Sequence, residues 1–284
     1  MIYNPYSGRG NIGSKINDIL KYLKDYEVSV FHSDYEREIT SYLFNNGARF
    51  DLVVLFGGDG TLNEAINGLM KIAKKPKLLY IPSGSVNDFG KFLGLKKNYK
   101  KCFKLLGGLP KKVDICKVGD EYFIYVLGCG KFTSISYDTR FYFLKRYFGR
   151  LFYYFKALKE VFKKYKFQVI TTVGDKKYIG KYFLFLALNI DNVASIKINK
   201  EKSKIDDGLI SLYLFKYRPF LSVLSLSMFF LFKRKSPFFI EEITINNFEM
   251  LFQDEMILNT DGEGKKYNKL LRIEVIKEAI EIYW

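Results

Sequence analysis

The stretch Leu52-Val53-Val54-Leu55-Phe56-Gly57-Gly58-Asp59-Gly60-Thr61 decides the fold class of this 284-residue chain. Its first five residues form an uninterrupted apolar run, which is typical of a strand buried on both faces. Glycines follow, and apolar residues then recur at helical spacing over residues 62–73. Thr61 and Glu64 have the spacing of a capping box, so the helix is expected to begin there. A strand, a glycine-rich turn and a helix in this order predict an α/β unit.

The first third of the chain repeats this alternation of short apolar runs and helical patterns. Residues 28–32, 52–56 and 78–81 are predicted strands, and residues 12–23, 39–45 and 62–73 are predicted helices. From about residue 113 one strand follows another, at residues 122–127, 167–173, 183–189, 209–215, 243–245, 249–258 and 270–276. We expect an α/β domain with a mostly parallel sheet over residues 1–116, followed by a β-rich, sandwich-like domain over residues 117–284.

The composition narrows the class of protein. With 48% apolar residues the chain can bury a large core, which argues against disorder. His32 is the single histidine, so an acid or base is expected to be a carboxylate. Cys102, Cys116 and Cys129 lack zinc-site spacing and indicate reduced thiols. No apolar run is long enough to span a membrane and no signal peptide is evident, so a cytoplasmic location is expected.

The formal charge of +16 indicates a polyanionic partner. Nucleic acid, an anionic phospholipid surface and nucleotide phosphates would all be suitable, and a general lysine-rich bias would also explain part of the excess. Charge alone does not choose among these partners.

Three loops carry residues suited to phosphate binding. Residues 57–61 lead into a helix N-terminus, where backbone N–H groups and the helix dipole favour anions. The carboxylate of Asp59 would repel phosphate unless a Mg²⁺ ion lay between them. Residues 4–10 and 82–89 also follow predicted strands and contain small and polar residues. Each loop alone could be an ordinary turn, but three loops at the carboxyl edge of one parallel sheet predict a nucleotide site.

Five motifs stand in order along the chain. They are Asn4-Pro5-Tyr6-Ser7-Gly8, Gly57-Gly58-Asp59-Gly60-Thr61-Leu62-Asn63-Glu64, Pro82-Ser83-Gly84-Ser85-Val86-Asn87-Asp88-Phe89, Asp206-Asp207-Gly208-Leu209 and Asp261-Gly262-Glu263. Together they resemble the diacylglycerol kinase catalytic family in its bacterial soluble form, which is related to sphingosine and ceramide kinases. The resemblance covers nearly the whole chain. It implies an NAD-kinase/diacylglycerol-kinase-like fold and an ATP-dependent lipid kinase that converts diacylglycerol to phosphatidic acid.

The resemblance also assigns nucleotide contacts by position. They are Asn4, Pro5, Tyr6, Ser7, Gly8, Ser33, Gly57, Gly58, Asp59, Gly60, Thr61, Leu62, Asn63, Glu64, Ser85, Asn87 and Asp88. Asp59 and Asp88 would hold the nucleotide Mg²⁺ through water. Ser33 and Ser85 stand where the family usually has Thr, a change that keeps the hydroxyl group and loses a methyl group.

The motif Asp261-Gly262-Glu263 supplies two candidates for the base that takes the acceptor's hydroxyl proton. The local pattern alone predicts an Asp-Gly hairpin turn. The resemblance places the catalytic base in this motif, and we rank Asp261 first with Glu263 as its close rival. It also implies a structural Mg²⁺ or Ca²⁺ held by the Asp207 side chain and the carbonyls of Lys204 and Leu209, where the local pattern predicts only a turn.

Two segments are candidates for contact with lipid. Residues 140–166 hold nine Lys or Arg residues against one acid, interleaved with aromatic residues at helical spacing. Such a helix can lie in the interface of an anionic membrane, and a helix packed on the β-rich domain is the alternative. Residues 219–232 are too short to span a bilayer and are expected to form a buried helix or a wall of the lipid pocket.

The expected partner is a lipid substrate at an anionic membrane, with the protein bound peripherally to the inner face of that membrane. A homodimer is compatible with the sequence. Nucleic acid is not expected, because no recognition motif accompanies the charge.

Other functions share part of the pattern. A sphingoid, ceramide or other lipid kinase would carry the same motifs. NAD kinases share the Gly-Gly-Asp-Gly-Thr loop, but residues 82–89 and the basic, aromatic second half argue against one. A lipid-binding regulator without catalysis is disfavoured because Asp59, Asp88, Asp261 and Glu263 are all present.

Overall fold

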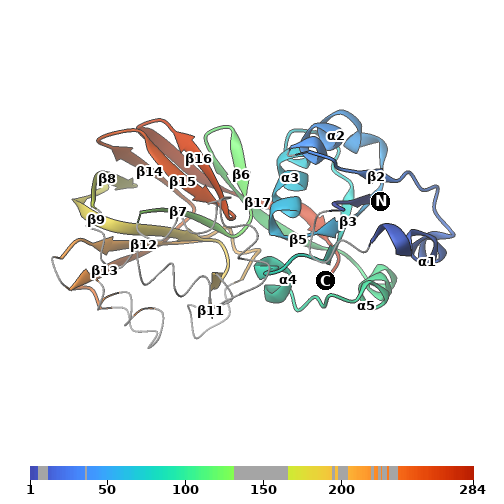
Figure 1. Ribbon diagram of the computed structural model, residues 1–284. Coiled ribbons are helices and arrows are strands. Elements are labelled where there is room, and N and C mark those ends of the chain that lie inside the picture. Colours follow the sequence, from blue (N-terminus) through green and yellow to red (C-terminus); the bar gives the residue numbers. More distant parts are fainter. Residues whose placement is uncertain are drawn as a thin grey trace.

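The computed structural model describes residues 1–5, 12–35, 37–130, 166–193, 196–197, 204–218, 221–222, 225, 229 and 236–284. Fifteen of the described strands are connected in one hydrogen-bonded network. This network runs through two parts of the molecule, an α/β part at the right of Figure 1 and a β-sandwich at the left. The predicted fold class is therefore confirmed.

In the α/β part, helices cover both faces of a mostly parallel sheet. The sheet order is β17-β4-β3-β1-β2, and these neighbours all pair in parallel. The strands special to this part are β1 (Ile2–Tyr3), β2 (Phe31–His32), β3 (Leu52–Gly57) and β4 (Lys77–Pro82). The helices are α1 (Ile16–Leu20), α2 (Glu38–Asn46), α3 (Asp59–Leu69), α4 (Asp88–Phe92) and α5 (Tyr99–Phe103), with 3₁₀ turns at Gly13–Lys15, Lys21–Leu23, Gly47–Arg49 and Lys104–Gly107.

The apolar run of β3 is continuous because both of its faces are buried. Val53 and Leu55 belong to the core cluster on the α2 and α3 side, whereas Val54 and Phe56 belong to the cluster on the α1 and α5 side. Alternate residues of a strand point to opposite faces, so a strand between two helical layers needs apolar residues at every position.

Helix α3 begins earlier than the capping box predicts. Asp59 is its first residue, and the N-cap Gly58 has extended backbone and no side-chain capping bond. The prediction that Thr61 and Glu64 cap the helix is therefore wrong, because the chain turns into α3 as soon as it leaves β3. A Cβ atom on Gly57 would come within 2.3 Å of Thr61, so only glycine permits this immediate turn.

The β-sandwich is built from antiparallel strands. They are β5 (Lys111–Val118), β6 (Glu121–Phe123), β7 (Val126–Gly130), β8 (Phe167–Val173), β9 (Lys176–Leu188), β12 (Ile210–Lys216), β13 (Ile240–Ile245), β14 (Asn247–Phe252), β15 (Met256–Thr260), β16 (Glu263–Tyr267) and β17 (Leu270–Ile282), with β10 (Asn192–Val193) and β11 (Ile196–Lys197) as a separate pair. Strand β9 serves both layers, since its first half pairs with β8 and its second half with β7 and β12. Phe185, Phe248, Met250 and Leu258 are buried between the layers.

Strand β17 joins the two parts of the molecule. Its first residues pair with β14 and β5 in the sandwich, and Ile282 near its end pairs with Leu78 of β4. The pairing register with β5 shifts between Ile276 and Ile280, where Glu278 has a positive φ of 52°. This bulge lets one strand leave the sandwich and enter the parallel sheet, so the last residues of the chain complete the first sheet.

The two segments expected to contact lipid lie almost entirely outside the described residues. Within residues 219–232, Phe229 is described and is buried against Tyr213 and Phe215, with ring centroids 5.1 Å and 4.9 Å apart. For the part of the chain that the structure describes, no helix has the length and apolarity needed to cross a membrane. The amphipathic helix over residues 140–166 stays a prediction.

Candidate active site

The three predicted phosphate loops lie together at the carboxyl edge of the parallel sheet. The N–H of Asn4 donates to Phe56 O at 3.3 Å, and the N–H of Ser83 donates to Gly57 O at 2.8 Å. The buried Ser33 follows β2, and its N–H donates to Tyr3 O at 3.3 Å. Each loop is thus tied to its neighbour by backbone hydrogen bonds. Tyr6, Ser7 and Gly8 lie outside the described residues.

The glycine loop presents the N-terminus of α3. Because Leu62 N donates to Gly58 O, the N–H groups of Asp59, Gly60 and Thr61 precede the first hydrogen bond within the helix. Such N–H groups and the helix dipole together favour an anion. The side chain of Leu62 is fully buried in the core, so it packs beneath the loop and does not face a nucleotide.

The loop over residues 83–87 packs directly against the glycine loop. A Cβ atom on Gly84 would come within 2.5 Å of Gly58 Cα. Asn87 has a left-handed backbone, with φ 54°, and its side chain donates to Gly84 O at 2.8 Å. Lys97, which the sequence analysis did not single out, donates to the carbonyls of Gly84 and Ser85. The spacing between the two loops is therefore set by glycine contact and by these hydrogen bonds.

Asp59 and Asp88 form an acidic pair beside the glycine loop. The carboxylate of Asp59 accepts hydrogen bonds from Asp88 N at 3.1 Å and Phe89 N at 3.4 Å. Burial, followed by the negative charge of Asp88, raises the pKa of Asp59 to about 6. Two carboxylates held together away from water, next to N–H groups suited to phosphate, fit a divalent cation between protein and phosphate.

Asp261 occupies a tight turn between β15 and β16. Asp261 and Gly262 both have positive φ, at 51° and 100°, as a two-residue type I′ hairpin requires. The turn that the local sequence pattern predicts and the motif that the resemblance predicts are therefore the same feature. Strand β16 was not predicted, because its residues Glu263 to Tyr267 carry little apolar pattern.

The Asp261 carboxylate is buried and fully hydrogen-bonded. Its Oδ1 accepts from Tyr125 N and Val126 N, both at 3.0 Å, and its Oδ2 accepts from Ile124 N at 2.7 Å and Asn63 Nδ2 at 2.8 Å. Burial raises the pKa of Asp261, and these four donors act in the opposite direction. Four donors occupy the four lone-pair positions of a carboxylate, so Asp261 ties α3 to the segment between β6 and β7.

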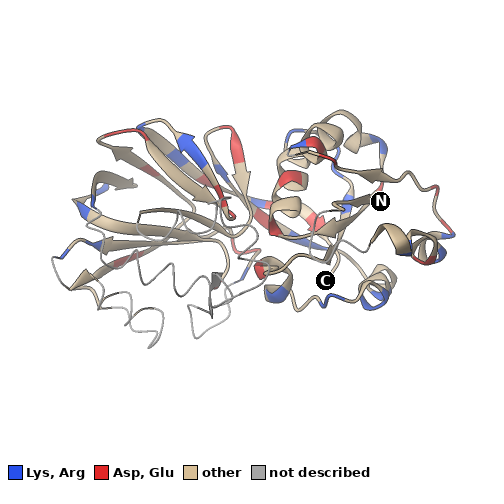
Figure 2. Ribbon diagram, viewed as in Figure 1, with Lys and Arg blue, Asp and Glu red and all other residues tan. Residues whose placement is uncertain are grey.

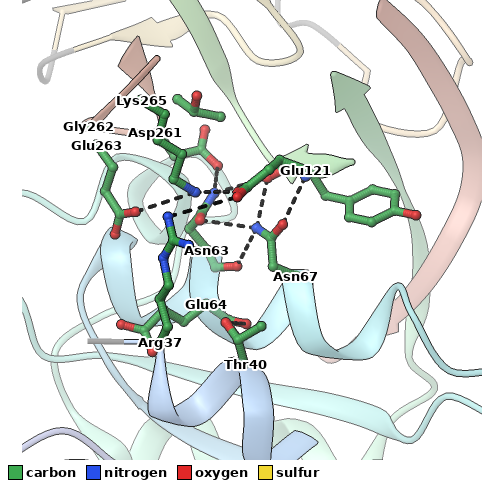
Figure 3. A network of polar contacts seen from close by, with 12 residues as sticks. Arg37, Thr40, Asn63, Glu64, Asn67, Glu121, Asp261, Gly262, Glu263 and Lys265 are labelled. Carbon is green, nitrogen blue, oxygen red and sulfur yellow. Dashed lines mark hydrogen bonds and ion pairs between the residues drawn. The ribbon is translucent and has the colours of Figure 1, made fainter. Parts of the chain in front are cut away.

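Asn67 is a site residue that the sequence analysis missed. Its side chain donates to Tyr122 O at 2.9 Å and accepts from Tyr122 N at 2.9 Å, and it also contacts Asn63, its neighbour one helical turn earlier. Figure 3 shows both asparagines between α3 and the Asp261 turn. The spacing of four residues between them was the available signal.

Glu263 differs from Asp261 in its surroundings. Its side chain is 40% exposed, and one of its carboxylate oxygens, Oε1, would lie 3.5 Å from a Cβ atom on Gly60. Glu263 therefore faces the glycine loop from the sandwich side. Figure 2 shows acidic residues on the elements where the two parts of the molecule meet, with Lys and Arg residues both there and on outer elements such as α5.

The structure gives no support to the predicted structural cation. The carboxylate of Asp207 accepts a hydrogen bond from Leu209 N at 2.9 Å, as in a turn, and Gly208 N donates to Asp114 at 2.6 Å. Among the described residues, no group of three or more His, Cys, Asp or Glu could hold a metal ion. The turn that the local pattern predicts is what these hydrogen bonds form.

Comparison with known proteins finds relatives of this chain among diacylglycerol kinases. The model of the diacylglycerol kinase catalytic domain matches residues 1–118. The chain is 31% identical over 221 residues to the diacylglycerol kinase of Bacillus subtilis (strain 168), covering 76% of this chain and 73% of the relative. It is 29% identical over 298 residues to the diacylglycerol kinase of Staphylococcus carnosus (strain TM300), covering 100% of this chain and 94% of the relative.

Solved structures share the fold. A diacylglycerol kinase from Bacillus anthracis str. Sterne has a TM-score of 0.76 at 22% identity, with 100% of this chain and 95% of that chain covered. An NAD kinase from Archaeoglobus fulgidus in complex with ATP has a TM-score of 0.55 at 14% identity, with 100% and 92% covered. The solved structures establish the fold, and the sequence relatives also establish the family. The chain belongs to the diacylglycerol kinase family of lipid kinases.

Proposed function

We propose that the protein transfers the γ-phosphoryl group of ATP to the free hydroxyl group of diacylglycerol, giving phosphatidic acid. The observation that carries the proposal is the position of Glu263, which faces the glycine loop from the other part of the molecule. Phosphate-binding groups and an exposed carboxylate thus approach one another across the junction. Phosphoryl transfer to an alcohol requires this combination.

The glycine loop binds the phosphates of the nucleotide. The N–H groups at the start of α3 donate to phosphate oxygens, and the helix dipole favours their charge. A Mg²⁺ ion held at Asp59 and Asp88 would neutralise charge on the β- and γ-phosphates. The loop at Ser85 and Asn87 then forms the neighbouring wall of the nucleotide site.

We assign the base to Glu263 rather than to Asp261, which reverses the order expected from sequence. All four acceptor positions of Asp261 are taken by N–H donors, whereas Glu263 is partly exposed and faces the loop. Glu263 accepts the proton of the lipid hydroxyl group while the hydroxyl oxygen of the lipid forms a bond to the γ-phosphorus. The bond from the γ-phosphorus to the bridging oxygen breaks, and ADP leaves with the electron pair.

Diacylglycerol is insoluble, so the reaction takes place at a membrane surface. The charge of +16 supports contact with an anionic bilayer, and residues 140–166 are the proposed contact segment. A peripheral enzyme of this kind needs access to one leaflet only.

The test is transfer of ³²P from γ-labelled ATP to a panel of acceptors in anionic and in zwitterionic vesicles. The panel contains diacylglycerol, sphingosine, ceramide, undecaprenol and, as a soluble acceptor, NAD. We expect label on diacylglycerol and faster transfer in anionic vesicles. Label on NAD alone, or on none of the acceptors, would refute the proposal, and label on another lipid would correct the acceptor.

A further inference from the structure

Two adjacent lysines on β16 lie in different surroundings. The side chain of Lys265 is 14% exposed, whereas that of Lys266 is 71% exposed and pairs with Glu255 at the surface. Neighbouring residues of a strand point to opposite faces, and residues two apart share a face. Lys265 therefore lies on the same face of the hairpin as Glu263, and Lys266 lies on the other.

Lys265 contacts two carboxylates from different elements. Its ammonium group donates a hydrogen bond to Glu121 of β6 and lies 3.8 Å from Glu263 Oε2. Glu121 in turn lies 4.0 Å from a guanidinium nitrogen of Arg37, the residue before α2. Figure 3 shows these four side chains near the Asp261 turn, joined by dashed lines through Lys265 and Glu121. A largely buried ammonium group needs carboxylate partners of this kind, so these contacts fix the position of the Lys265 ammonium group.

The two oxygens of Glu263 face different groups. Oε2 is the oxygen near Lys265, and Oε1 is the oxygen near Gly60. The backbone at Asp261 and Gly262 is fixed by the turn and by the hydrogen bonds of Asp261, but the Glu263 side chain has three further rotatable bonds. Contact with Lys265 restrains those bonds and directs Oε1, the other carboxylate oxygen, toward the glycine loop.

We propose that Lys265 is a positioning residue for Glu263. It holds one carboxylate oxygen so that the other faces the acceptor hydroxyl above the glycine loop, and Glu121 holds Lys265 in turn. This inference rests on the proposed function, in which Glu263 receives the proton. Positioning of a reacting group within a fraction of an ångström changes the rate of the chemical step more than the binding of substrate.

A stabilising ion pair between Lys265 and Glu121 alone would have different consequences. Its loss would weaken the contact between β16 and β6 and lower stability, and Lys265→Met and Glu121→Gln would then behave alike. Under the positioning role they differ, because Glu121→Gln removes the supporting carboxylate and leaves Lys265 beside Glu263. Lys265→Met removes the contact with Glu263 itself.

The experiment compares the purified wild type with the Lys265→Met, Lys265→Arg, Glu121→Gln and Lys266→Met variants in labelled phosphate transfer to diacylglycerol. We expect Lys265→Met to lower kcat by about 10- to 100-fold with KM for ATP changed less than about threefold. Lys265→Arg should recover most of that loss, and Glu121→Gln should lose less than Lys265→Met. Lys266→Met is the matched control and should stay within about twofold of wild type.

The outcomes separate this inference from the function on which it rests. Equal kcat for Lys265→Met and Lys266→Met in an active wild type would overturn the positioning role and leave the lipid kinase intact. Equal losses for Lys265→Met and Glu121→Gln, with no recovery in Lys265→Arg, would also overturn it. A wild type that transfers no label to any lipid would instead refute the proposed function.

Discussion

Asp261 shows how a residue predicted to be catalytic can have a structural task. Its carboxylate accepts three backbone N–H groups and the amide of Asn63, and it is buried. Two of those N–H groups belong to Ile124 and Tyr125, which divide the predicted strand over residues 122–127 into β6 and β7, and the third belongs to Val126, the first residue of β7. The break occurs because these N–H groups bond to a side chain instead of a neighbouring strand.

Replacing Asp261 should therefore lower stability. Asp261→Asn keeps one acceptor oxygen and brings an N–H₂ group toward buried N–H donors, so up to two of them lose their partners. We expect the free energy of unfolding to fall by about 2–4 kcal/mol in urea titrations. Asp254→Asn is the control, because Asp254 is exposed near the same hairpin and should change stability by less than about 0.5 kcal/mol. An Asp261→Asn variant as stable as the control would contradict the structural role.

The raised pKa of Asp59 should make the stability of the protein depend on pH. Its pKa of about 6 in the folded protein lies above the ordinary value near 3.8, so folding takes up a proton between those pH values. Stability from this group is greatest at low pH and falls as pH rises from about 4 through 6. With metal removed by EDTA, Asp59→Asn should gain about 3 kcal/mol over wild type at pH 7.5 and less than about 1 kcal/mol at pH 4. A constant difference across this range would show that Asp59 is not perturbed as described.

At the scale of elements, the contact between the glycine loop and the loop over residues 83–87 shapes the proposed nucleotide site. Gly84→Ala would place a methyl group within 2.5 Å of Gly58 Cα. Because this neighbour is a backbone atom, a side-chain rotation cannot relieve the overlap. We expect the loops to separate, KM for ATP to rise by about tenfold and stability to fall by about 1–3 kcal/mol. Gly107→Ala meets no atom within 4 Å and serves as control. Unchanged ATP affinity in Gly84→Ala would mean that this contact does not shape the site.

Helix α3 is held against β6 by Asn67. Asn67→Ala would remove the acceptor of Tyr122 N–H and one donor to Tyr122 O, which keeps its 3.2 Å hydrogen bond from Asn63 Nδ2. It would also remove the donor to Asn63 Oδ1. The expected loss is about 2–4 kcal/mol, read from thermal or urea unfolding. The control is Asn46→Ala on α2, which removes a single hydrogen bond from the side-chain amide to Tyr42 O. Its loss in the free energy of unfolding should be less than half that of Asn67→Ala. Equal losses in the two variants would show that Asn67 is an ordinary helix residue.

At the scale of the whole molecule, much of the architecture could be predicted from sequence. Continuous apolar runs at residues 52–56 and 78–81 identify strands buried on both faces. The later strands follow in the expected order, but the strands predicted over residues 122–127 and 249–258 are each divided in two, into β6 and β7 and into β14 and β15. What sequence could not give was the path of β17, which is predicted to end at residue 276 but continues to Ile282. Its pairing with β4 depends on a bulge at Glu278, and no local pattern specifies a partner so distant in sequence.

The motif residues of the candidate site could be predicted from the sequence, but the residues that hold them in place could not. Asp59, Asp88 and Glu263 follow from motifs. The contacts of Lys97 and Lys265 leave no pattern in a lysine-rich chain. The ranking of Asp261 and Glu263 as candidates for the base depends on hydrogen bonds between Asp261 and residues more than 130 positions away. Such contacts become visible only when the fold brings the two parts together.

The central claim is that the glycine loop and Glu263 form one active site across the two parts of the molecule. The most direct measurement is single-turnover transfer of ³²P from ATP to diacylglycerol by wild type and by Glu263→Gln, with ATP affinity measured in parallel. We expect Glu263→Gln to bind ATP within about twofold of wild type and to form phosphatidic acid at least about 100-fold more slowly. Transfer at the wild-type rate by Glu263→Gln would contradict it.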